Sequence, residues 1–217
     1  MKSGNVIKSL NEVSQRKLVI PTGGTMGSKP YDLPRFPPYN VATFDCHEIV
    51  SIMKGHISDP MVDYYDWGVY EESERLIKDS KQFSSSDISS LAGIIRNNNE
   101  HNFIVIPHGT DNVAHNATLL KTELQHHLQT SNKVVAFVCS MVPLSMHNQM
   151  QPDGSKLESD ALAALSYTFN KVAEQQSGVY VVARDIHTKR LGFSAPETVE
   201  KNRFESKAAL QFTVHSK

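Results

Sequence analysis

The sequence has little cysteine, and its cysteine and histidine residues form no recognisable ligand pattern. Cys46 and Cys139 are far apart, and neither lies in a Cys-x-x-Cys motif or beside histidines with the spacing of zinc ligands. This excludes a disulfide framework and a structural zinc site, so both thiols are expected to be inert and partly buried. The ten histidines, including the pair His126 and His127 near the end of an expected helix, are interpreted as solvated surface.

The chain also has no charge imbalance and no long apolar run. The 22 lysines and arginines nearly balance the 23 aspartates and glutamates, so the net charge is -1. Such a chain lacks the positive field that attracts nucleic acid or an anionic membrane. The first residues, Met1 to Gln15, are polar and contain no apolar core of a secretory signal. We therefore expect a soluble, cytoplasmic protein that binds neither nucleic acid nor membrane.

Short β-branched runs are the strongest structural signal in the sequence. They are almost continuously apolar rather than alternating, which is typical of strands covered on both faces. The four runs are Lys17–Pro21, Phe103–Ile106, Lys133–Val138 and Gly178–Val182.

Between these runs the apolar residues repeat every three or four positions, which predicts amphipathic helices. The expected helices are Ser84–Arg96, with Ser84 and Asp87 as a capping pair, Asp111–Leu128, and one that starts at Ser159 and ends before Gly178. Strand alternating with helix predicts an α/β fold, with a doubly wound, mainly parallel sheet and helices on both faces. We expect residues 1–16 to be an N-terminal extension and residues 17–217 to be one domain.

Glycine residues and hydroxyl-bearing threonines follow two of the expected strands. The first strand continues into Thr22-Gly-Gly-Thr25, and the second into His108-Gly-Thr-Asp111. In a parallel sheet the loops after the strands form the ligand site, and glycine allows the backbone to approach a ligand closely. Each motif alone is equally typical of an ordinary turn, a helix cap or a weak phosphate loop.

Together, the two motifs resemble the signature motifs of the L-asparaginase/glutaminase family. The resemblance extends through Ser140-Met-Val-Pro143, Ser159-Asp160 and the strand at Gly178, and covers about Lys17 to Glu205. It implies the flavodoxin-like fold of the asparaginase N-terminal domain. The second, smaller domain of the full-length enzymes has no counterpart here, so the sequence resembles the short, single-domain branch.

The resemblance also implies roles for individual residues. Thr25 matches the nucleophile that attacks the substrate carboxamide, and Thr110 with Asp111 matches the second catalytic threonine and its acidic neighbour. Ser80 and Asp111 match the groups that hold the α-carboxylate and α-ammonium of an amino-acid substrate. Ser140 is expected beside them, and no metal or cofactor is implied.

The general base and the lysine of the family each have two candidates. Tyr31 and Tyr39 lie in the proline-rich loop that follows Thr25, and Tyr31 is preferred because Lys29-Pro-Tyr31 resembles the Asp-Lys-x-Tyr of the short branch. For the lysine, Lys189 follows Gly178 too soon to leave room for the usual hairpin. Lys201 arrives several residues late, but an insertion in an exposed hairpin costs little free energy, so Lys201 is preferred.

Several positions depart from the family pattern without removing a proposed catalytic group. Cys139 and Ser140 replace Gly-Ala, Asn112 replaces a threonine, and Ala161 and Ala164 replace Gly and Asn. These changes affect the shape of the pocket and therefore the preference for asparagine.

The leading hypothesis is an amidohydrolase that deamidates asparagine or a related small amide through a threonyl acyl-enzyme. The alternatives are a catalytically silent module that binds an amino acid or a protein partner, and, more weakly, a phosphate-binding protein. We expect a homo-oligomer in which a neighbouring chain, or the loop from Lys29 to Tyr39, supplies the wall that the second domain forms in longer enzymes.

Overall fold

The computed structural model describes most of the central part of the chain. The described residues are 16–30, 41–43, 46–67, 69–71, 74–76, 80–140, 143–148, 150, 153–156, 159–185, 188, 190–201 and 212–214. For residues 25, 28–30, 41–43, 46–48, 69–71, 74–76, 201 and 212–214, only the backbone is described. The expected boundary between residues 16 and 17 remains a prediction.

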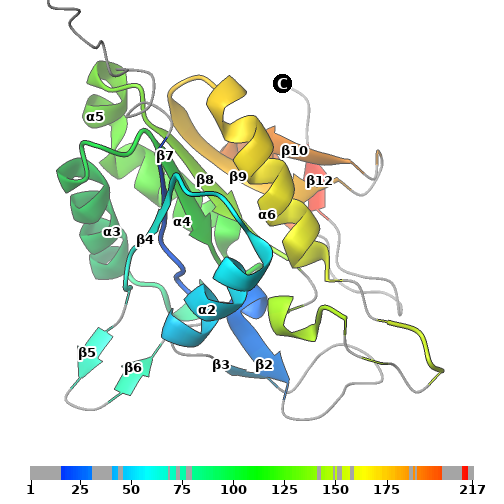
Figure 1. Ribbon diagram of the computed structural model, residues 1–217. Helices are drawn as coiled ribbons and strands as arrows, with labels where there is room; N and C mark the ends of the chain where they lie inside the picture. Colours follow the sequence, from blue (N-terminus) through cyan, green and yellow to red (C-terminus); the bar gives the residue numbers. More distant parts are fainter. Residues whose placement is uncertain are drawn as a thin grey trace, which may run out of the picture.

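A sheet of six strands forms the centre of the fold, in the order β10-β9-β8-β7-β1-β4. Five of these strands run parallel, and only β10, which forms a hairpin with β9, is antiparallel. The predicted α/β fold with a mainly parallel sheet is therefore confirmed (Figure 1). The strands are β1 (Lys17–Val19), β4 (Val62–Tyr64), β7 (Phe103–Pro107), β8 (Val134–Val138), β9 (Gly178–Arg184) and β10 (Leu191–Ser194).

Helices pack on both faces of this sheet and give it two apolar cores. On one face, α3 (Ser85–Asn97) and α4 (Val113–Glu123) pack on Ile104, Ile106, Val135 and Phe137. On the other, α2 (Cys46–His56) and α6 (Asp160–Lys171) pack on Val19, Val105, Ala136 and Val138. In Figure 1 α2 and α6 lie on the viewer's side of the sheet. Burial of alternate residues on opposite faces explains why the central strands are continuously apolar in sequence.

Hydrogen-bonding side chains start the helices where the sequence predicts. Ser84 caps α3 in a capping box with Asp87, and Ser159 caps α6 by accepting a hydrogen bond from the Ala161 N–H. The helix expected over Asp111–Leu128 is divided into α4 and α5 (Gln125–Thr130). Backbone hydrogen bonds from Leu124 to Leu120 and from Leu128 to Leu124 cross the division, so the apolar stripe remains continuous.

Some elements carried no clear signal in the sequence. Helix α2 and the edge strand β4 were not predicted; β4 has three residues, all half-buried, and lacks an apolar run. The hairpin expected after the Gly178 strand is present, as β9 and β10. Among the described residues, three antiparallel pairs lie outside the main sheet: β2 (Ser28–Pro30) with β3 (Val41–Thr43), β5 (Val69–Glu71) with β6 (Glu74–Leu76), and β11 (Val199–Lys201) with β12 (Phe212–Val214). Within the described part of the chain, no helix has the length and apolar character needed to span a membrane.

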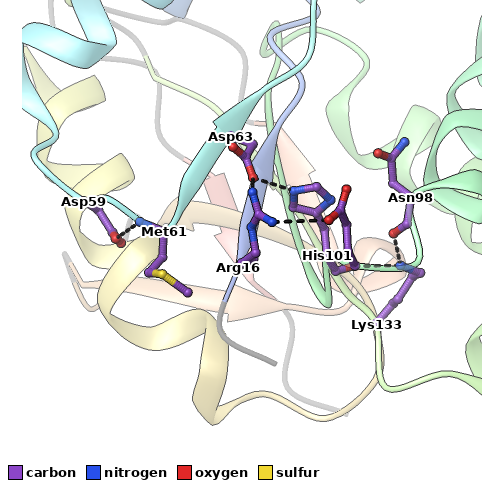
Figure 2. A network of polar contacts seen from close by, with 8 residues as sticks. Arg16, Asp59, Met61, Asp63, Asn98, His101 and Lys133 are labelled. Atoms are coloured by element: carbon purple, nitrogen blue, oxygen red, sulfur yellow. Dashed lines mark hydrogen bonds and ion pairs between the residues drawn. The ribbon is translucent and has the colours of Figure 1, made fainter. Parts of the chain in front are cut away.

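A polar network joins segments at the amino-terminal side of the sheet (Figure 2). Arg16 contacts Asp63 at 2.6 Å, and the His101 Nε2 atom lies 2.8 Å from the same carboxylate oxygen. The ammonium of Lys133 donates to the backbone carbonyls of Asn98 and His101 at 2.7 and 2.6 Å. The pKa of Asp63 is lowered, mainly because of the hydrogen bond from His101. Desolvation acts in the opposite direction but is the smaller effect. The network therefore ties β1, β4, β7 and β8 together at their starts.

Candidate active site at the carboxyl ends of the strands

The two glycine motifs lie side by side where β1 and β7 end. The Thr22 N–H donates to the Pro107 carbonyl at 3.0 Å, and the His108 N–H donates to the Val138 carbonyl at 2.9 Å. These bonds continue the ladders of β1, β7 and β8 beyond the strands. The loops after all three strands therefore start at one edge of the sheet, where an α/β fold places its ligands.

Gly24 and Gly109 are in contact, and the contact leaves no room for a side chain on Gly24. A Cβ atom on Gly24 would lie 2.0 Å from the Gly109 Cα and 2.2 Å from the Gly109 nitrogen. Gly24 also has a φ of +74°, in the left-handed region that favours glycine. Glycine at position 24 is therefore required both by its own backbone conformation and by the closeness of the second loop.

Ser80 is brought to the same point from a third segment. A Cβ atom on Gly109 would lie 2.5 Å from the Ser80 Oγ, so the bare backbone of Gly109 makes room for this hydroxyl. Ser80 is 2% exposed, and its carbonyl accepts a hydrogen bond of 3.1 Å from the Asn116 side chain. The structure thus brings together Gly24, Gly109 and Ser80, which belong to three of the segments that the sequence singled out.

A buried histidine connects these segments through its side chain. The Nε2 atom of His108 lies 2.9 Å from the Asn116 Nδ2 atom, which can only donate, so Nε2 is the acceptor. Nδ1 therefore carries the proton and donates to the Thr22 Oγ1 at 2.7 Å, while Thr22 donates to the Pro107 carbonyl at 2.9 Å. Every donor in this chain of bonds has an acceptor.

His108 is fully buried, and desolvation lowers its pKa from 6.5 to about 3. The rings of Phe83 and Phe137 pack edge-on against it at 4.8 and 5.2 Å between centroids. His108 is therefore a neutral connector at neutral pH. The expectation that the histidines are solvated surface is therefore wrong for His108, and also for His101, which is 3% exposed. From the sequence neither His108 nor Asn116 had a role, because only the fold shows which groups they meet.

The next two residues of the motif differ in exposure. Thr110 is buried, at 4% exposed, whereas the Asp111 side chain is 30% exposed. The Lys81 ammonium lies 2.8 Å from the Asp111 Oδ2 atom. Lys81 was missed by the sequence analysis; the only available signal was a basic residue directly after Ser80.

The remaining predicted site residues are only partly described. The backbone of Thr25 begins a 3-10 turn, η1 (Thr25–Gly27), which contacts a second turn, η3 (Leu144–Met146). Ser140 is buried, two residues beyond the end of β8. The backbone of Lys201 ends β11, after the β9–β10 hairpin, while Tyr31, Tyr39 and Lys189 lie outside the described residues.

Cys139 is next to Ser140 and is buried, and burial raises the pKa of its thiol well above the ordinary value. This agrees with the expectation of an inert thiol; for Cys46 the side chain is not described. In the described part of the chain, no three His, Cys, Asp or Glu side chains are grouped so that they could hold a metal ion.

A comparison with known protein families shows which family the chain is related to. A family profile described as "Asparaginase, N-terminal" matches residues 16–211. The chain belongs to the asparaginase family. This confirms the family that the two glycine motifs predicted from the sequence.

Solved structures show the same fold for this asparaginase-family chain. L-asparaginase I from Vibrio cholerae superimposes with a TM-score of 0.58 at 23% identity, over 92% of this chain and 51% of the other. A probable cytoplasmic L-asparaginase from Campylobacter jejuni gives a TM-score of 0.63 at 19% identity, over 90% of this chain and 52% of the other. The chain therefore spans about half the length of these proteins. No curated protein matches it.

Proposed function

We propose that this chain is an amidohydrolase that deamidates asparagine or a related small amide and releases ammonia. The observation that carries the proposal is the contact of Gly24 with Gly109 and of Gly109 with Ser80. This contact joins the loops of the two asparaginase motifs to the segment expected to bind substrate. Neither a simple turn nor a helix cap requires that two such loops meet.

In the proposed reaction the Thr25 hydroxyl attacks the carboxamide carbon of the substrate. The C–N bond then breaks, ammonia leaves with a proton from the site, and the acyl group remains as an ester on the threonine. Water adds to this ester, the ester C–O bond breaks, and the carboxylic acid and the free Thr25 hydroxyl are released. The sum is amide plus water to acid plus ammonia, and no metal or cofactor takes part.

A threonine hydroxyl is a weak nucleophile at neutral pH and needs a base within hydrogen-bond reach. We propose Tyr31 as this base, with Thr110, Asp111 and Lys201 as the group that carries protons in the second half of the reaction. Backbone N–H groups near Thr110, ahead of α4, suit the developing oxyanion. Ser80, Asp111 and Ser140 are proposed to hold the substrate.

We further propose a homo-oligomer in which a neighbouring chain, or the loop from Lys29 to Tyr39, covers this site. Exclusion of water strengthens the electrostatic interactions that the reaction needs. Light scattering combined with the ammonia assay tests this: a fully active monomer would count against a need for assembly.

Ammonia release from asparagine, glutamine and small aliphatic amides tests the activity. The purified chain should release ammonia from at least one of them, and Thr25→Ala should reduce the rate to background. The matched control is Thr118→Ala, which removes an exposed hydroxyl from α4 that bonds only within its own helix.

If the wild type releases no ammonia from any amide but binds an amino acid saturably, the silent-module alternative holds. The proposed activity is also wrong if Thr25→Ala keeps most of the rate.

A further inference from the structure

The ion pair between Lys81 and Asp111 places a cation of the protein itself at the candidate site. The Lys81 Nζ atom lies 2.8 Å from the Asp111 Oδ2 atom, and Lys81 directly follows Ser80, which contacts Gly109. The pair is therefore adjacent to the point where the glycine loops and Ser80 meet.

Local structure explains why Lys81 lies over Asp111. Ser80 begins a short 3-10 turn, η2 (Ser80–Gln82), just before the capped start of α3. Successive residues of a 3-10 turn point about 120° apart. Ser80 is thus buried against Gly109 while Lys81 points outward to Asp111, and the 3-10 turn sets both positions together.

The charge of Lys81 affects which ligands Asp111 can hold. A zwitterionic amino acid that pairs its α-ammonium with Asp111 must displace the Lys81 ammonium or share the carboxylate with it, against the repulsion of two positive charges. A ligand that has a carboxylate and no ammonium avoids this repulsion and is attracted by Lys81. Because the Lys81 and Asp111 side chains are 66% and 30% exposed, solvent weakens the pair, and the resulting preference is modest.

We infer that Lys81 is a specificity-determining residue, and that it favours amide substrates that carry a carboxylate but no α-ammonium group. The inference rests on the proposed amidohydrolase function and names the substrate class for it. Succinamate, which is asparagine with hydrogen in place of the α-amino group, is the simplest member of this class.

The test compares kcat/KM for succinamate and asparagine in the wild type, Lys81→Gln, Lys81→Arg and Lys121→Gln. Lys121→Gln is the matched control, because Lys121 forms an exposed ion pair of 3.0 Å with Glu197 away from the site. The wild type should prefer succinamate. In Lys81→Gln, the kcat/KM for succinamate divided by that for asparagine should fall by about two- to fivefold. This is the range expected for a solvent-exposed ion pair.

Lys81→Arg retains the charge and should keep the wild-type ratio, and Lys121→Gln should also keep it. The difference between the wild type and Lys81→Gln should shrink in 1 M NaCl, where the Debye length is about 3 Å. An unchanged ratio in Lys81→Gln, an equal change in Lys121→Gln, or preference of the wild type for asparagine would overturn the inference while leaving the amidohydrolase function in place.

If no amide is hydrolysed, calorimetric titration with succinate and L-aspartate tests the role of Lys81 separately from the proposed amidohydrolase activity. Tighter binding of succinate that is lost in Lys81→Gln would support the role of Lys81 although the proposed activity fails. Failure of the wild type to bind either ligand would overturn both.

Discussion

The backbone of Gly24 lies against that of Gly109, so close that a Cβ atom on Gly24 would be 2.0 Å from the Gly109 Cα atom. Gly24 follows β1 and Gly109 follows β7, and these strands pair in parallel. The carboxyl ends of neighbouring strands thus bring together two loops that are remote in sequence, and two residues without side chains allow them to touch.

Gly24→Ala should destabilise the protein by at least about 2 kcal/mol, because the new Cβ atom meets backbone and the φ of +74° is unfavourable for alanine. Chemical denaturation measures this, with Gly93→Ala in α3 as the control. A Cβ atom on Gly93 meets nothing within 4 Å, and alanine should stabilise this helical position by about 0.5–1 kcal/mol. Equal effects of the two substitutions would contradict the close contact.

His108 should make the free energy of unfolding dependent on pH. Its folded-state pKa of about 3 is below the ordinary 6.5, so between these values the unfolded state binds more protons than the folded state. Stability should therefore fall as the pH is lowered from about 6.5 toward 3, by at most about 1.4 kcal/mol per pH unit from this group. Urea titrations over this range measure the slope.

His108→Asn removes the titrating group and should flatten this slope, while lowering stability at pH 7 because the bonds to Thr22 and Asn116 are disturbed. His126→Asn, which replaces an exposed imidazole on α5, is the control and should leave the free energy of unfolding at pH 7 nearly unchanged. A slope that persists unchanged in His108→Asn would show that other groups cause it.

Lys133→Met should destabilise the fold by about 1–3 kcal/mol without reducing activity, because it removes the ammonium donor from the His101 carbonyl and leaves the Asn98 carbonyl with only the longer bond from the His101 N–H. Lys133 immediately precedes β8 and belongs to the network of Figure 2, whereas the candidate site lies beyond the opposite, carboxyl ends of the strands. Lys121→Met, at an exposed ion pair, should cost less than about 1 kcal/mol. Loss of ammonia release in folded Lys133→Met would contradict this separation.

Lys201→Met should abolish ammonia release, whereas Lys189→Met should retain it. The preference for Lys201 assumes a hairpin between the Gly178 strand and the lysine, and the structure has this hairpin, with Arg184 of β9 opposite Leu191 of β10. Lys189 falls between these two residues in sequence, and Lys201 comes after them. The ammonia assay on both variants decides, and the reverse pattern would assign the role to Lys189.

Much of the fold could be predicted because its signals are local. The continuously apolar strands, the stripe through Leu120, Leu124 and Leu128, and the caps at Ser84 and Ser159 depend on residues within a few positions of each other. The edge strand β4 was not predictable in the same way. Strand β4 has three residues, all half-buried, and therefore lacks the apolar run that marks a central strand in the sequence.

For the site, the sequence by itself determined which segments carry glycine and hydroxyl groups after strands, and through them the asparaginase family. Only the tertiary structure decided that Gly24 touches Gly109, that His108 joins Thr22 to Asn116, and that Lys81 pairs with Asp111. The reason is that local periodicity fixes the direction of a side chain relative to its own strand or helix. A contact such as that between Thr22 and His108, 86 positions apart, depends on strand order and on the packing of the helices against the sheet.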